Sequence, residues 1–172
     1  MTLGPIRAAR ASDLADLVRI YNHYVRETPV TFDTEPFGVE ARREWFAQFS
    51  DTGPHRLLVW EEDGAVRGYA HSGRHRPKPA YARSVETTIY LEPDFTGRGA
   101  GRRLYTALLD ALRAEPAVHR SFAGVTLPNA ASIALHTGLG FTPVGVFREI
   151  GWKFERYWDV AWYACDLEAP AD

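Results

Sequence analysis

Three glycines at alternate positions, followed by a helical pattern, are the part of this sequence best suited to binding a ligand. Gly97, Gly99 and Gly101 let backbone N–H groups approach a ligand with no Cβ in the way. A helix that follows them would carry positive partial charge at its N-terminus, so residues 96–101, here called the glycine turn, predict an anion site. A Rossmann fingerprint would need glycine where Arg102 stands, and no Walker A Gly-Lys-Ser/Thr follows. A plain glycine-rich turn stays the alternative.

A carboxylate lies in the strand just before this turn. Residues 85–91 alternate as a pleated strand does, with Glu86 on the face opposite Val85 and Ile89. Pro93 ends the strand because proline cannot donate to a ladder. Glu86 is therefore an acidic group in an otherwise apolar or hydroxyl-bearing strand. The alternative role is a carboxylate paired with one of the many arginines.

The other elements are expected to surround this strand, turn and helix. After the turn, an apolar stripe predicts a helix; its members are Leu104, Tyr105, Leu108, Leu109 and Leu112. Before the strand we expect a strand over residues 3–8, a helix capped by Ser12, a loop over 28–36, a helix over 39–49, and a hairpin of residues 55–62 and 65–73 turning at Asp63-Gly64. After the helix we expect a strand over 121–127, a helix from Asn129 through Leu135, and two antiparallel strands over 141–149 and 153–166.

Length and composition restrict the class of protein. The 172 residues fit one domain, residues 1–172, and 45% hydrophobic content favours a soluble globular chain. A net charge of −2 argues against nucleic acid or an anionic membrane as partner. Cys165 is the one cysteine, and residues 1–10 lack the apolar core of a secretory signal, so a cytoplasmic location is expected. His23, His71 and His75 show no metal-ligand spacing, so no metal is expected.

With its flanking strand and helix, the glycine turn resembles the coenzyme A site of the Gcn5-related N-acetyltransferases (GNAT), whose pattern is Arg/Gln-x-x-Gly-x-Gly/Ala. Thr96 departs from it, standing where the family usually has Arg or Gln. The chain looks most like the phosphinothricin and methionine sulfoximine or sulfone acetyltransferases of that family. The matching segments are residues 21–24 (Tyr-Asn-His-Tyr), 31–36 (Thr-Phe-Asp-Thr-Glu-Pro), 85–90 (Val-Glu-Thr-Thr-Ile-Tyr), 127–129 (Leu-Pro-Asn), 135–136 (Leu-His) and 158–160 (Trp-Asp-Val).

This resemblance implies the fold and the cosubstrate. The fold would be α+β, with a central mixed, mostly antiparallel sheet that is flanked by helices and splayed at strands 4 and 5. Acetyl-CoA would be the cosubstrate, with its pyrophosphate on the glycine turn and its pantetheine pairing with the fourth strand. The coenzyme-binding residues implied are Ile89, Tyr90, Leu91, Gly97, Arg98, Gly99, Ala100, Gly101, Arg102 and Asn129.

The resemblance also assigns catalytic and substrate roles. Glu86, raised in pKa by burial, would accept the proton of the amine directly or through water, and the amine would attack the thioester directly. His136 would protonate the leaving thiolate or join the proton path. Phe32, Arg76, Lys78 and Tyr81 align with substrate-binding positions, where cations suit an amino acid with a second polar sulfur or phosphorus group. The alternatives are a hydrogen-bonded structural histidine and a solvated loop.

The expected function is therefore N-acetylation of a small amino-acid-like amine, and with it resistance to antibiotic or herbicide compounds of that type. The aromatic residues of 152–163 and the family's frequent mode of assembly predict a homodimer. Two rival functions stay open. One is acetylation of a protein N-terminus or lysine, and the other is a non-catalytic coenzyme A binding module.

Overall fold

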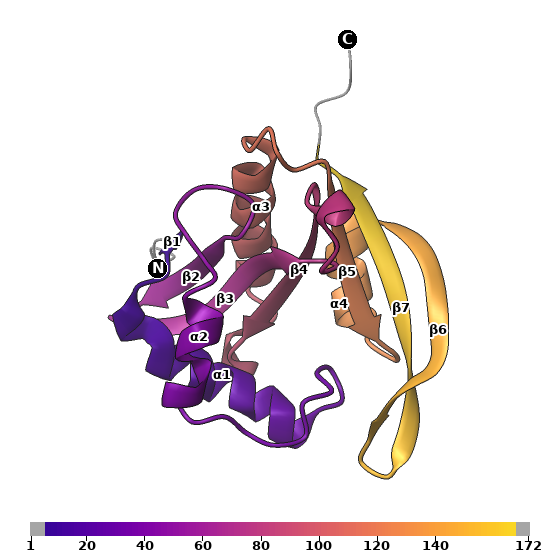
Figure 1. Cartoon of the computed structure of the whole chain (residues 1–172). Helices are drawn as coiled ribbons and strands as arrows, with labels where there is room; N and C mark the ends of the chain where they lie inside the picture. The colour runs from indigo at the N-terminus through magenta and orange to yellow at the C-terminus, as the bar shows by residue number, and fades with distance from the viewer. Residues whose placement is uncertain (1–5, 168–172) are drawn as a thin grey trace.

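The computed structural model of the chain describes residues 6–167, whose strands form one seven-stranded sheet (Figure 1). The strand order is β1-β2-β3-β4-β5-β7-β6, and all neighbouring pairs are antiparallel except β4 with β5. The strands are β1 (Ile6–Ala8), β2 (Leu57–Glu62), β3 (Ala65–Arg74), β4 (Ser84–Leu91), β5 (Arg120–Thr126), β6 (Thr142–Lys153) and β7 (Arg156–Asp166). The predicted mixed, mostly antiparallel sheet is confirmed.

Helices cover both faces of the sheet (Figure 1). One face carries α1 (Leu14–Glu27) and α2 (Arg43–Phe46), and the other carries α3 (Ala100–Arg113) and α4 (Ala130–Gly138). Short 3-10 turns are η1 (Ala11–Asp13), η2 (Glu40–Arg42), η3 (Pro79–Tyr81) and η4 (Pro93–Phe95). The sheet is thus enclosed between two helical layers.

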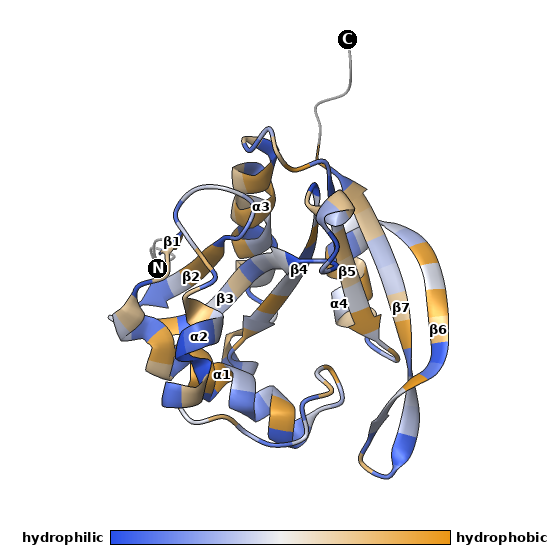
Figure 2. Cartoon of the chain, in the orientation of Figure 1, coloured by the Kyte–Doolittle hydropathy of each residue, from blue (hydrophilic) through white to orange (hydrophobic). Residues whose placement is uncertain are grey.

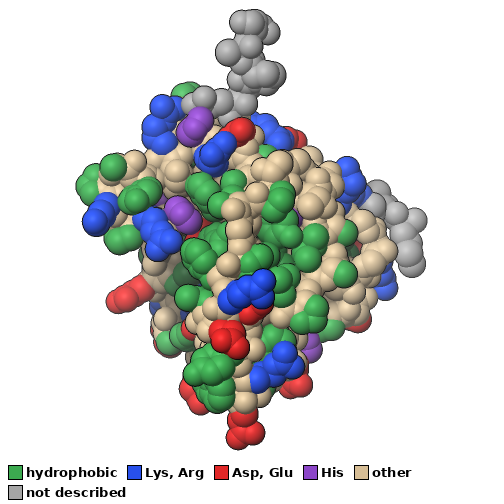
Figure 3. All heavy atoms as spheres, turned by 90° about the vertical axis from the view of Figure 1, so that its right-hand side faces the viewer, with side chains coloured by type: hydrophobic (Ala, Val, Ile, Leu, Met, Phe, Trp, Pro, Cys, Tyr) green, Lys and Arg blue, Asp and Glu red, His purple; other side chains and the backbone are tan. Residues whose placement is uncertain are grey.

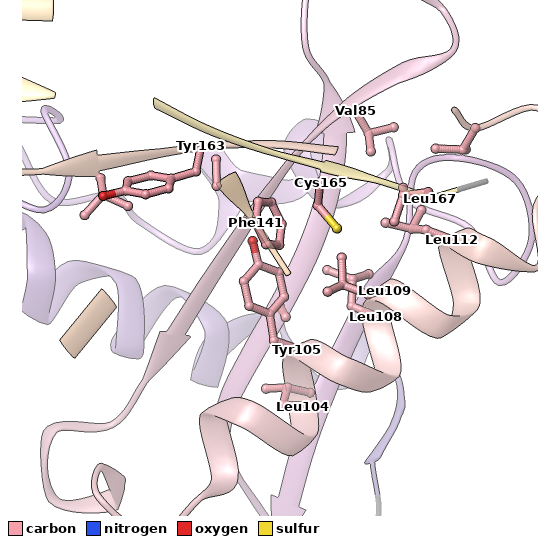
Figure 4. Packing of buried hydrophobic residues seen from close by; sticks show 14 of the residues in the cluster. Val85, Leu104, Tyr105, Leu108, Leu109, Leu112, Phe141, Tyr163, Cys165 and Leu167 are labelled. Atoms are coloured by element: carbon pink, nitrogen blue, oxygen red, sulfur yellow. The ribbon is translucent and has the colours of Figure 1, made fainter. Parts of the chain in front are cut away.

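The larger core lies between α3 and the sheet (Figure 4). Leu104, Leu108 and Leu112 recur at every fourth position, and each is fully buried. This is the predicted apolar stripe. Burying one such leucine is worth about 2 kcal/mol, so the stripe fixes α3 firmly, and with it the glycine turn at its N-terminal end.

The two parallel strands separate soon after they begin. β4 pairs with β5 over three positions, ending at Glu86 with Phe122, while β3 stays paired with β4 as far as Leu91. Figure 1 shows β4 and β5 together at their upper ends and diverging below. The predicted splay between the fourth and fifth strands is confirmed, and one side of β4 beyond Glu86 has no strand beside it among the described residues.

Two helix boundaries differ from the predictions. Ser12 does not cap the first helix; the chain enters it through η1, where the Asp13 carboxylate accepts the Arg10 amide at 2.6 Å. The second predicted helix, residues 39–49, is shortened to η2 and α2, and tight turns carry the chain on to Phe49. The Ser50 amide then donates to the His55 carbonyl, which redirects the chain into β2.

The last hairpin turns later than predicted. Lys153 belongs to β6, and the turn is formed by Phe154 and Glu155, both with positive φ. Glu149, also with positive φ, lies in an irregular stretch where the register shifts between Phe147 and Gly151. Residues 150–152, which the sequence prediction leaves between its two last strands, therefore lie inside one long strand that contains a bulge.

Two expectations concern other parts of the chain. The first strand was predicted from residue 3, and residues 3–5 lie outside the described residues. The same holds for residues 1–5 of the segment 1–10, on which the expectation about a secretory signal rests. Within residues 6–167, no helix is both long and apolar enough to cross a bilayer.

Candidate active site

A cavity of about 630 Å³ lies where β4 and β5 diverge. Its walls come from α1 and the loop after it, from β4, β5 and the glycine turn, and from α4. The lining residues include Tyr24, Val30, Thr31, Glu86, Thr87, Ile89, Tyr90, Leu91, Gly97, Gly99, Gly101, Arg102, Asn129 and His136. The structure thus brings the two catalytic candidates and most of the coenzyme candidates to one space.

The glycine turn needs glycine for two different reasons. Gly97 and Gly99 both have φ of +75°, a conformation that L side chains rarely adopt, while a Cβ on either would meet open space. Gly101 lies close to the strand, since a Cβ there would come within 3.3 Å of the Leu91 side chain. Gly99 is also the N-cap of α3 and has no side chain to cap it. The first-turn amides of α3 can therefore bind an anion, and the arrangement fits a pyrophosphate.

Two predicted coenzyme residues of the turn lie outside the cavity wall. The Ala100 side chain is buried in the core, and the Arg98 guanidinium lies over the Phe95 ring, 5.5 Å from its centroid. Their main-chain amides stay in the turn. Thr96, which departs from the family pattern, lines the cavity and donates its hydroxyl proton to the Pro93 carbonyl at 3.1 Å.

Strand β4 presents the residues expected to pair with pantetheine. Ile89, Tyr90 and Leu91 all line the cavity, and β3 pairs with β4 on the side away from β5. The Tyr24 hydroxyl donates to the Leu91 carbonyl at 2.6 Å. The stretch therefore has a strand on one side and the cavity on the other, which is the setting that an added strand-like ligand requires.

Glu86 lies at the last position where β4 pairs with β5, beside the cavity. Its side chain is 40% exposed, and its Oε2 lies 3.6 Å from Nδ1 of His75. Burial raises the pKa of Glu86, and the nearby charges of His75 and Arg76 oppose this rise in part. Among the ion pairs of the described residues, the partner of Glu86 is thus a histidine and not an arginine, and the carboxylate also lines the cavity.

His136 is buried near the end of α4, and both of its ring nitrogens meet protein groups. Nδ1 lies 2.7 Å from the Ser132 carbonyl oxygen, which can only accept, so Nδ1 carries the proton. Nε2 lies 3.2 Å from the Tyr105 hydroxyl, which also meets Thr87 at 2.7 Å. Burial lowers the pKa of His136, although the bond to Ser132 opposes this. Burial therefore disfavours the charged imidazolium, and Nε2 lies at the end of a buried hydroxyl chain.

Asn129 caps α4, as its position predicts. Its Oδ1 accepts the Ser132 amide at 3.0 Å, and the residue also lines the cavity. Its amide nitrogen is the group that could donate to a ligand.

The four substrate-binding candidates lie outside the cavity wall. The Phe32 ring packs against Gly151 of β6, where an added Cβ would come within 2.1 Å of it. Arg76 is close enough to influence Glu86, whereas Lys78 and Tyr81 are exposed in the loop between β3 and β4. The structure therefore groups Arg76 with the site and leaves the roles of the other three as predictions.

Sequence reasoning missed several wall residues, including one whole side of the cavity. Tyr24, Val30 and Thr31 come from α1 and the loop after it and form the wall facing β4. Tyr24 and Thr31 fall in two of the segments that resemble the family, residues 21–24 and 31–36, and this resemblance could have pointed to them. Neither a tyrosine nor a threonine stands out there by its charge or spacing. Among the described residues, no group of three or more His, Cys, Asp or Glu could hold a metal ion.

Comparison with known proteins agrees with this geometry. A family model described as an acetyltransferase (GNAT) domain matches residues 6–162. A phosphinothricin N-acetyltransferase of Streptomyces coelicolor is 54% identical over 160 residues, covering 92% of this chain and 93% of its own. An L-methionine sulfoximine/L-methionine sulfone acetyltransferase of Salmonella typhimurium is 35% identical, covering 96% of each chain. A GNAT superfamily phosphinothricin acetyltransferase of Sinorhizobium meliloti, solved in complex with acetyl-CoA, superposes with a TM-score of 0.91 at 31% identity, covering 98% of this chain and 90% of its own.

Proposed function

Since the chain belongs to the GNAT acetyltransferase family, we propose that it transfers an acetyl group from acetyl-CoA to the α-amine of a small amino-acid-like substrate. The substrate would be of the phosphinothricin, methionine sulfoximine or methionine sulfone type, as the names of its relatives indicate. Acetyl-CoA as cosubstrate is supported by the complex of the Sinorhizobium enzyme with it.

One observation carries the proposal: the cavity has the glycine turn at one end and Glu86 at the other. Leu91 lies five positions after Glu86, which at a strand rise of about 3.3 Å per residue is about 16 Å, a length comparable to an extended pantetheine arm. A pyrophosphate on the turn would therefore place a thioester beside Glu86.

The chemistry follows from the groups that line this space. Acetyl-CoA supplies the activated acetyl thioester. Glu86 accepts a proton from the substrate ammonium, directly or through water, so that the nitrogen lone pair attacks the thioester carbonyl. A main-chain N–H of residues 89–91 donates to the carbonyl oxygen as negative charge develops there. The C–S bond then breaks, the nitrogen loses its second proton as the amide forms, and this proton replaces the one that reaches the sulfur, with His136 as the donor or as part of the proton path.

The raised pKa of Glu86 suits this role. A carboxylate of ordinary acidity is a weak base toward an ammonium, and burial moves its pKa toward the working pH. Arg76 lies near enough to act on Glu86 electrostatically, so its guanidinium is also placed to hold an acidic group of the substrate. Phe32, Lys78 and Tyr81 would complete the pocket by movement of their loops.

We further propose that the enzyme acts as a homodimer in the cytoplasm. β6 lies at the edge of the sheet and exposes large apolar side chains; they are Val144, Val146, Phe147, Ile150 and Trp152. Figure 2 shows hydrophobic positions recurring along β6, and Figure 3 shows hydrophobic side chains gathered on the side where β6 lies. An uncovered apolar edge favours a partner, and a second copy of the chain fits it by symmetry.

Thiol release with a panel of amines tests the function. We expect turnover with phosphinothricin, methionine sulfoximine or methionine sulfone, and a loss of about 100-fold or more in kcat for Glu86→Gln with acetyl-CoA binding retained. Glu62→Gln, another strand carboxylate, should behave as wild type. Turnover on an array of protein N-termini but not on the panel would favour the peptide alternative, and tight acetyl-CoA binding without turnover on any amine would favour a binding module.

A further inference from the structure

His75 lies in a fixed position beside Glu86, although it follows β3 in a loop. Its ring stacks on Phe122 of β5, with centroids 4.4 Å apart and planes inclined by 14°, and meets the Trp162 ring of β7 edge-on at 5.8 Å. The side chain is 13% exposed. The imidazole is therefore held by rings from two other strands and has little freedom to turn away.

The strand register explains why this ring reaches the carboxylate. Glu86 is paired with Phe122 on one side and with Gly73 on the other. Gly73 has no side chain that could fill the space beside Glu86. His75 follows two residues later, and its ring packs over Phe122. The ring and the carboxylate are thus brought together by three neighbouring strands.

The Nδ1 of His75 is buried and has no hydrogen-bond partner among the described residues. The Oε2 of Glu86 lies 3.6 Å from it, just beyond the range of a direct hydrogen bond. A buried polar nitrogen without a partner is costly, so the arrangement favours a small movement that closes this gap. The Glu86 side chain, 40% exposed, has the freedom to make that movement.

Two other titratable groups of the described residues interact with Glu86. Arg76 acts on it from the same loop as His75, and the charge of Glu86 contributes to the raised pKa of Tyr105 in α3. The nearby positions of β5 and β7 contribute the uncharged rings of Phe122 and Trp162. His75 is thus the titratable group whose atom faces the Glu86 carboxylate most directly.

We propose that His75 is a positioning residue for Glu86: its Nδ1–H donates to the carboxylate, turns it toward the substrate amine and keeps it ionised. This proposal rests on the proposed role of Glu86 as the base. No bond other than hydrogen bonds forms or breaks in this step.

Two substitutions separate the hydrogen bond from the packing. His75→Phe keeps a ring on Phe122 and Trp162 but removes the donor, whereas His75→Asn places an amide nitrogen near the position of Nδ1. We expect His75→Phe to lower kcat and to move the acid limb of kcat/KM upward by about one pH unit, since Glu86 loses a stabilising partner. His75→Asn should recover most of kcat, and His55→Asn, outside the cavity wall, serves as the matched control.

A second measurement needs no turnover. The side-chain carboxyl of Glu86 can be titrated by carbon-13 NMR in the full chain, in wild type and in His75→Phe, and we expect titration at higher pH in the variant. An unchanged titration and an unchanged rate profile in folded His75→Phe would overturn the proposal. If Glu86→Gln retains full turnover, the proposed role of Glu86 as the base fails, whereas absence of turnover on every amine of the panel contradicts the proposed function; in either case the NMR titration still reports whether the two side chains are linked.

Discussion

The Nζ of Lys153 donates a hydrogen bond to the main-chain carbonyl of Thr31, 2.8 Å away. Lys153 is 4% exposed at the end of β6, and Thr31 lies in the cavity wall. Two residues earlier on the same strand, Gly151 receives the Phe32 ring. The end of β6 therefore holds the loop that contributes Val30 and Thr31 to the cavity wall, through two alternate residues of one strand face.

Replacing Lys153 by Met should loosen this loop. The Thr31 carbonyl would lose its partner, at a cost of about 1–3 kcal/mol, while the apolar stem of the side chain is kept. We expect a higher KM for the amine with little change in the KM for acetyl-CoA, and a lower melting temperature. Arg113→Met, which removes an exposed ion pair of α3, should change neither the KM for the amine nor the melting temperature measurably. Equal KM values for the amine in Lys153→Met and wild type would contradict the role given to this contact.

A methyl group at Gly99 should weaken coenzyme binding. The residue has φ of +75° and open space around a built Cβ, so alanine is opposed by backbone conformation, at about 1–2 kcal/mol, and not by a clash. Relief of that strain would turn the amides at the start of α3 away from a pyrophosphate. Calorimetry with acetyl-CoA should show roughly tenfold weaker binding, since 1.4 kcal/mol is a factor of ten. Gly38→Ala, with open space and no positive φ, is the control, and unaltered affinity in Gly99→Ala would place the pyrophosphate elsewhere.

Removing the Tyr105 hydroxyl should affect both stability and proton transfer. That hydroxyl joins Thr87 to Nε2 of His136 in the buried core. In Tyr105→Phe we expect about 1–3 kcal/mol lower stability in a denaturant titration. We also expect a fall in kcat smaller than the 100-fold or more that direct proton transfer commonly contributes. Tyr157→Phe, at an exposed ring, controls for the chemistry of the change. If kcat is unchanged in folded Tyr105→Phe, His136 acts without this partner.

The exposed edge of β6 predicts how the chain assembles. Trp152 is 56% exposed there, so a charge at this position should disturb an interface without disturbing the core. Light scattering should give a dimer mass for wild type and a mass nearer the monomer for Trp152→Glu. Val39→Glu, at an exposed apolar side chain on the other side of the fold, should leave the mass unchanged. A monomeric mass for wild type rejects the homodimer.

Local signals correctly predicted the strand, the turn and the helix around Glu86 and Gly99. Alternation marks a strand, leucines four residues apart mark a helix, and glycines mark a turn, and in each case the structure results from contacts close in the sequence. The Asp63-Gly64 turn was predicted for the same reason, and both residues have positive φ. The splay of β4 from β5 was implied by the family resemblance alone.

What the sequence could not show depends on contacts between distant segments. The β6–β7 turn is formed by Phe154 and Glu155, whose φ angles are 52° and 57°. Turns of this kind usually contain Asn-Gly, so a Phe-Glu pair does not predict one. The pairing of His75 with Glu86 needs Phe122 and Trp162, from strands much later in the chain. The Lys153 contact with Thr31 spans 122 positions, so no local pattern could predict it.

The short ladder between β4 and β5 has a mechanical consequence. Three paired positions near Glu86 join the four-stranded part of the sheet, β1 to β4, to the three-stranded part, β5 to β7. The cavity is lined from both parts. A molecule that fills it would therefore add contacts between two halves of the sheet that share few backbone hydrogen bonds.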